Sequence, residues 1–95
     1  MILHMFTVYD SKAEAFLQPF FSQSRGTAIR SFSEAANDEK HQFHRHAGDF
    51  TLFELGEFDQ LTADVKQLQA PVKLGTALEY IEVVPDNVVN LGGSK

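Results

Sequence analysis

The chain has 95 residues, of which 43% are hydrophobic and 12% aromatic, and its formal net charge is −5. This length fits one domain with a small core, and nine phenylalanines with no tryptophan indicate that phenylalanine rings fill much of it. Because the chain has no cysteine, a disulfide framework, a thiolate metal site and a thiol nucleophile are excluded. So small a domain often shares apolar surface with a second copy, and we expect a homodimer.

The negative charge is unevenly distributed along the chain. Residues 1–24 hold one base and two acids, and residues 47–95 hold three bases and eight acids. Residues 25–46 hold four bases and three acids, a net charge of +1 before any histidine is protonated. The total argues against a strongly electrostatic nucleic-acid binder, so any anion-binding surface should use residues 25–46.

Two elements are predicted before residue 20. Residues 2–9, ILHMFTVY, predict a strand, and because both of its faces are largely apolar we expect a central or interface strand. Residues 1–9 are too short and too polar for a signal peptide, and no run is long enough to span a membrane. Residues 12–17 predict a short helix that Asp10 or Ser11 would cap and Pro19 would stop.

The clearest periodicity lies in residues 27–38, TAIRSFSEAAND. Apolar side chains at helical spacing predict an amphipathic helix whose buried stripe holds Ala28, Ile29, Phe32, Ala35 and Ala36. On its polar side Arg30 and Glu34 stand four residues apart, where they would form an ion pair, and Asn37 and Asp38 would end the helix.

The second half of the chain predicts a hairpin. Residues 49–58, DFTLFELGEF, predict a strand, and a weaker strand at 65–69 would return beside it before Pro71 breaks the chain. Residues 74–78 fit a short helix or turn, and EYIEVV after it fits an edge strand. We therefore expect an α+β fold, a small antiparallel sheet with one main amphipathic helix packed on one face. Residues 1–84 would form the single domain and residues 85–95 a flexible C-terminal tail.

Three histidines lie close together in HQFHRH. His41, His44 and His46 match no standard zinc spacing, and the neighbouring Lys40 and Arg45 would repel a cation. The pattern therefore favours a solvated loop or an anion contact over a metal site.

Catalytic patterns are weak as well. There is neither a nucleophile elbow nor a glycine-rich phosphate loop. On a regular strand Glu54 and Glu57 would point to opposite faces, and only a bulge, for which Gly56 is a candidate, would bring them together. We expect no enzyme and no cofactor.

Residues 20–46 contain the cations and aromatic rings that a single-strand binder needs. The predicted phosphate contacts are Arg25, Arg30, Lys40, His44 and Arg45. Phe43, flanked by polar and basic residues, is the predicted base-stacking ring, whereas Phe20 and Phe21 are more typical of a core. The histidines would add positive charge in mildly acidic solution.

Four blocks of the sequence, VYDSKAEAFLQPFF, GTAIRSFSEAAND, GDFTLFELGEFD and APVKLGTALEYI, resemble the small nonstructural protein of gokushovirus-type microviruses, which are single-stranded DNA phages. The resemblance runs from about Val8 to Ile81 but brings no established binding residues, and the HQFHRH loop is richer in histidine and arginine than that family's pattern. It implies a DNA-binding protein of the host cell cytoplasm that acts in the switch from duplex replication to synthesis of single-stranded progeny genomes. The alternative is an adaptor that binds the phage initiator or a host replication factor through the acidic hairpin.

Overall fold

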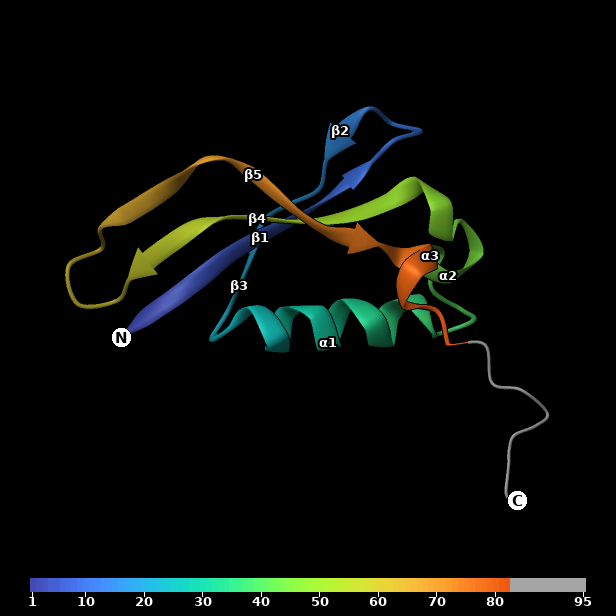
Figure 1. Ribbon diagram of the computed structural model, residues 1–95, viewed down its shortest axis with the longest axis horizontal. Helices are drawn as coiled ribbons and strands as arrows, with labels where there is room; N and C mark the ends of the chain where they lie inside the picture. The colour runs from blue at the N-terminus through green and yellow to red at the C-terminus, as the bar shows by residue number, and fades with distance from the viewer. Residues whose placement is uncertain (83–95) are drawn as a thin grey trace, which may run out of the picture.

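The computed structural model describes residues 1–82, and Figure 1 shows the arrangement of their elements. In chain order these are β1 (Ile2–Asp10), β2 (Ala15–Phe16), β3 (Phe20–Ser22), α1 (Arg25–Ala36), α2 (Gln42–Arg45), the 3-10 turn η1 (Ala47–Asp49), β4 (Phe50–Asp59), β5 (Val65–Thr76) and α3 (Ala77–Tyr80). The predicted α+β class is confirmed, because the strands form one five-stranded antiparallel sheet and α1 is the main helix. The predicted tail at 85–95 lies outside the described residues.

The predicted first strand is confirmed and is central to the sheet. The strands are ordered β2-β1-β4-β5, and β3 also pairs with β1. All of these pairings are antiparallel, with Phe6 opposite Phe20 of β3 and opposite Glu54 of β4. The strand β5 therefore forms one edge, and the two short strands β2 and β3 share the other.

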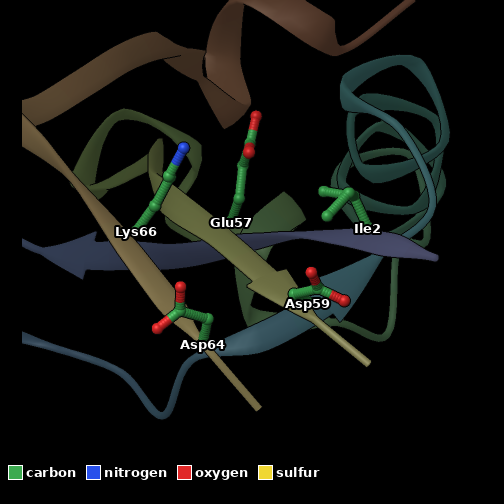
Figure 2. Close-up of a pocket in the computed structure, with 5 residues that line it drawn as sticks. All are labelled: Ile2, Glu57, Asp59, Asp64 and Lys66. Atoms are coloured by element: carbon green, nitrogen blue, oxygen red, sulfur yellow. The ribbon is translucent and has the colours of Figure 1, made fainter. Parts of the chain in front are cut away.

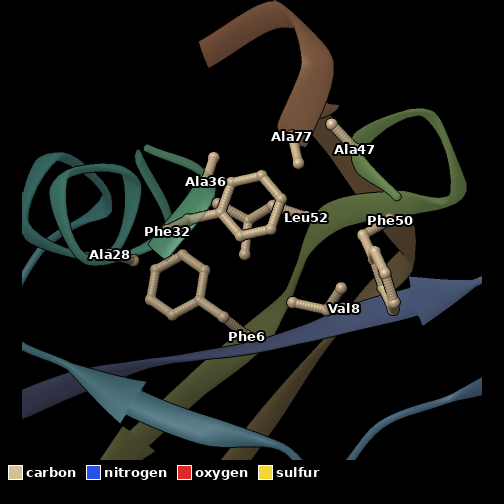
Figure 3. Packing of buried hydrophobic residues seen from close by; sticks show 9 residues of the cluster. All are labelled: Phe6, Val8, Ala28, Phe32, Ala36, Ala47, Phe50, Leu52 and Ala77. Carbon is tan, nitrogen blue, oxygen red and sulfur yellow. The ribbon is translucent and has the colours of Figure 1, made fainter. Parts of the chain in front are cut away.

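The core lies between α1 and one face of the sheet. Three small or aromatic side chains of the predicted helical stripe, Ala28, Phe32 and Ala36, are buried there. From the sheet, Phe6 and Leu52 are both 0% exposed. The full cluster, drawn in Figure 3, comprises Phe6, Val8, Ala28, Phe32, Ala36, Ala47, Phe50, Leu52 and Ala77.

Side-chain caps define both ends of α1. Ser24 accepts a hydrogen bond from the backbone N–H of Thr27, which satisfies one of the free donors in the first turn. At the other end the Asn37 amide donates to the carbonyl oxygens of Ser33 and Tyr80, at 2.8 and 2.9 Å. One side chain thus ends the helix and attaches it to α3.

The short helix predicted over residues 12–17 is wrong. The carboxylate of Asp10 accepts from the backbone N–H groups of Lys12 and Ala13, which holds a tight turn instead of a helical start. Glu14 then adopts φ 55°, and the chain reverses into β2, which pairs with β1. A local side-chain bond therefore prevails over the propensity of the next residues.

Two expectations for the C-terminal half are also wrong. Pro71 does not end the second strand of the hairpin, because β5 is an edge strand and tolerates a residue that lacks an N–H group. The edge strand predicted over EYIEVV does not form within the described residues. Glu79 and Tyr80 are instead the last two residues of α3, which begins at a capping box between Thr76 and Glu79.

Strand β4 contains the bulge for which Gly56 was a candidate. Met5 lies opposite Gly56 and Phe6 lies opposite Glu54, so Leu55 has no partner on β1. Because the alternation of side chains is shifted by one residue, Glu54 and Glu57 lie on the same face, the one covered by α1. Gly56 is required here, since a Cβ atom would lie 2.2 Å from the carbonyl oxygen of Lys66.

Candidate nucleic-acid interface

Three of the predicted phosphate contacts, Arg30, Lys40 and Arg45, lie exposed on the helical side of the molecule. Arg30 is in the middle of α1, Lys40 is in the turn that follows it, and Arg45 is the last residue of α2. None of the three forms an ion pair with another described residue, so the expected Arg30–Glu34 pair is absent within residues 1–82. We call these three residues the cationic set.

Arg25 differs from the cationic set because it has a structural partner. Its Nε atom donates to Glu54 Oε1 at 2.8 Å, and its Nη2 atom lies 2.6 Å from the same oxygen. The Glu54 side chain is only 8% exposed and also lies 3.3 Å from His4 Nδ1. Since Arg25 is the first residue of α1, this pair fixes the start of the helix to the middle of β4.

The histidines His41 and His44 of the HQFHRH segment each form a separate local hydrogen bond. His44 Nδ1 lies 2.9 Å from the carbonyl oxygen of Ala36, the last residue of α1, and donates a hydrogen bond to it. His41 Nδ1 accepts from the backbone N–H of Phe43 and caps α2. Within residues 1–82, no three His, Asp or Glu side chains are grouped so that they could hold a metal ion.

Phe43 is not the exposed ring that the sequence suggested. Its centroid lies 5.4 Å from that of Phe32 and 4.7 Å from that of Phe50, and the ring packs against the core cluster. The expectation failed because α2 turns this side of the loop inward although polar residues flank Phe43 in the sequence. Among the predicted site residues, Arg30, Lys40 and Arg45 are therefore exposed, whereas the ring of Phe43 packs against the core.

The exposed aromatic rings lie instead on the other face of the sheet. The strand register places on it Met5, Tyr9, Phe16, Phe21, Phe53 and Phe58, and we call this surface the helix-free face. Ring centroids lie 4.8 Å apart for Tyr9 and Phe16, 5.7 Å for Phe16 and Phe53, and 5.8 Å for Phe21 and Phe58. The alternation of apolar residues in the first predicted strand was the signal for this second apolar face.

The register of β3 on β1 places its two neighbouring phenylalanines on opposite faces of the sheet. The sequence predicted a core position for both Phe20 and Phe21. Phe20 fulfils this prediction, because its ring stacks on that of Phe6 at a centroid distance of 5.6 Å and packs against the core. Phe21 points to the opposite face and is 49% exposed, so the expectation of a core position is wrong for it. Sequence reasoning could not separate the two without the register of β3 on β1.

The turn of the β4–β5 hairpin projects away from the helices, and we call residues 57–66 the hairpin arm. A hollow of about 160 Å³ on it is lined by Ile2, Glu57, Asp59, Asp64 and Lys66, whose side chains are drawn in Figure 2. At the tip of the arm Leu61 is 86% exposed. The arm thus combines an acidic surface with an apolar tip.

The family comparison now gives these surfaces a context. A family model described as phage ORF5 protein matches residues 3–80. The chain belongs to this phage protein family. The searches of curated proteins and of solved structures gave no match.

The phage ORF5 match runs from the second residue of β1 to the last residue of α3. The cationic set, the helix-free face and the hairpin arm therefore all lie within the part of the chain that the family model covers. Within residues 1–82, no helix is both long and apolar enough to cross a membrane.

Proposed function

We propose that this phage ORF5 family protein is a non-enzymatic protein that binds single-stranded DNA in the host cell cytoplasm. Its role would be in viral genome replication, at the switch from duplex to single-stranded progeny DNA synthesis, as the resemblance to microvirus nonstructural proteins implies. The observation that carries the proposal is the cationic set, three exposed bases on the helical side of an otherwise acidic chain.

The geometry favours contacts to phosphate over contacts to bases. Arg30 lies on α1, Lys40 lies in the turn after it, and Arg45 lies on α2. The half-buried Phe43 packs against the core. Phosphate contacts carry no sequence information, so binding should depend little on base sequence. Arg25 contributes to the fold through Glu54, and we leave it out of the proposed contact set.

Fluorescence anisotropy with labelled single- and double-stranded oligonucleotides, repeated over a range of salt concentrations, tests the proposal. Each phosphate contact to a single strand contributes about 0.7 to the slope of log K against log salt, so three contacts predict a slope near −2. A triple change, Arg30→Ala, Lys40→Ala and Arg45→Ala, should remove most of that slope.

The matched control changes three bases elsewhere, Lys12→Ala, Lys66→Ala and Lys73→Ala, and alters the net charge equally. If the two triple variants lose the same affinity, binding follows net charge alone and the cationic set is not the site. If the wild-type protein shows no binding at about 50 mM salt, where phosphate contacts are strong, the DNA proposal fails.

A second candidate function rests on the hairpin arm. Its acidic side chains and the exposed Leu61 suit a protein partner with a basic, partly apolar surface, such as the phage initiator or a host replication factor. Pull-down with the purified phage initiator should then depend on Leu61 and Asp64. A Leu61→Ser, Asp64→Asn variant that still binds the initiator as tightly would exclude the arm.

A further inference from the structure

The helix-free face leaves large apolar side chains of the described residues uncovered. Phe16 is 52% exposed and Phe21 is 49% exposed, although rings of this size are usually buried. The same face holds a hollow of about 290 Å³, whose lining includes Phe16, Leu17, Leu55 and Pro71. Contiguous apolar surface of this kind on a small protein marks an interaction site.

This face is nearly free of charge, which distinguishes it from the rest of an acidic chain. Among the residues paired in the sheet, Lys73, opposite Phe53, is the only charged one that the register places there. The bulge at Leu55 is the reason, because it turns Glu57 and Asp59 to the helical side and Phe58 to the helix-free face. A nucleic acid would find a single cation here, whereas its affinity depends on neutralising phosphates.

The edges of the sheet are poor alternatives for assembly. Strand β5 contains Pro71, and its pairing with β4 shifts register twice. The opposite edge is divided into β2, with two residues, and β3, with three, and Pro19 lies between them. Short, interrupted edges hinder strand addition, so the face is the better surface for association.

We infer that the helix-free face binds a second copy of this chain, so that two sheets pack face to face. Two copies that each carry a net charge of −5 repel one another over most approaches, and this nearly uncharged face is where they can meet. Packing of identical faces about a twofold axis buries the apolar face of both copies in one interface, with the sheets about 10 Å apart. The helices of both copies would then lie on the outside, and their cationic sets would face away from each other.

Analytical ultracentrifugation over a range of protein concentrations tests this assignment without DNA. We expect a species of twice the 10.6 kDa chain mass, and at least a roughly 100-fold rise in its dissociation constant for the Phe16→Ser, Phe21→Ser variant. As matched controls, Leu61→Ser and Leu78→Ser remove exposed apolar side chains outside this face and should leave the dimer intact.

A cysteine placed on each side of the sheet gives a second readout if the double variant fails to fold. The chain has no cysteine, so a single Gln67→Cys change, opposite Gly56, adds one thiol near the proposed interface. Oxidation should cross-link this variant into dimers, while Ser31→Cys on the exposed side of α1 should stay monomeric under denaturing electrophoresis.

Three outcomes would overturn the inference. The first is a wild-type protein that remains monomeric up to about 100 µM, a concentration well above the dissociation constants of specific interfaces. The second is a dimer that survives the Phe16→Ser, Phe21→Ser change, which would place the interface elsewhere. The third is a monomeric wild type whose affinity for single-stranded oligonucleotides falls in that variant, which would assign the face to DNA. Because ultracentrifugation uses no nucleic acid, dimer formation can fail while the proposed DNA binding stands.

Discussion

Both faces of the sheet carry large apolar side chains, but the two faces differ in what covers them. On one face Phe6 and Leu52 are 0% exposed beneath α1, and Glu54, the one buried carboxylate of residues 1–82, is paired with Arg25. On the other face Phe16 and Phe21 remain about half exposed, and the register leaves a single charge among the paired residues. The difference shows that the covered face stabilises the fold, whereas the helix-free face is available for association.

The sharpest test of this contrast compares two rings on opposite faces. Phe6→Ala removes a fully buried ring and should lower the free energy of unfolding by about 3–5 kcal/mol, measured by urea denaturation. At protein concentrations too low for association, Phe21→Ala should lower it by less than about 1 kcal/mol. Equal losses for the two variants would mean that the helix-free face belongs to the core of the monomer.

A smaller effect is expected from the bulge that separates the two faces. Gly56→Ala places a Cβ atom against the Lys66 carbonyl oxygen, and such overpacking costs about 1–3 kcal/mol in the free energy of unfolding. Gly48→Ala is the control, because no atom lies within 4 Å of its added Cβ. If thermal denaturation gives the same melting temperature for both variants, the bulge is not a fixed feature.

The smallest expected effect concerns the charge beneath α1. Glu54→Gln keeps the shape of the side chain but removes its charge, so the hydrogen bonds to Arg25 and His4 weaken by about 1 kcal/mol in total, since Arg25 is partly exposed. Glu57→Gln makes the same change on the same face without an ion pair among the described residues. Chemical denaturation that shows a larger loss for Glu57→Gln would contradict the assigned pairing.

The spacing of apolar residues predicted those helices and strands in which the spacing is repeated several times. The stripe of α1 and the alternation in β1 and β4 are of this kind, because burial on one face imposes them. The prediction failed at Glu14 and Pro71, where a single side-chain bond or an edge position decides the backbone.

The candidate site was less predictable than the fold. Sequence reasoning found the exposed bases Arg30, Lys40 and Arg45, since clustered charge is visible without a structure. It assigned the wrong exposure to Phe43 and Phe21, because exposure of an aromatic ring depends on the register and on the path of α2. Long-range pairing of this kind leaves no local signal in the chain.

The unpaired Leu55 links the composition of both sheet faces to the way in which β4 pairs with β1. If Leu55 paired with Met5 in place of Gly56, the bulge would disappear and the end of β4 would slip by one residue along β1. Glu57 and Asp59 would then enter the helix-free face, and Phe58 would leave it. A slip of one residue, without any change of sequence, would therefore place carboxylates on the face through which we propose that two copies associate.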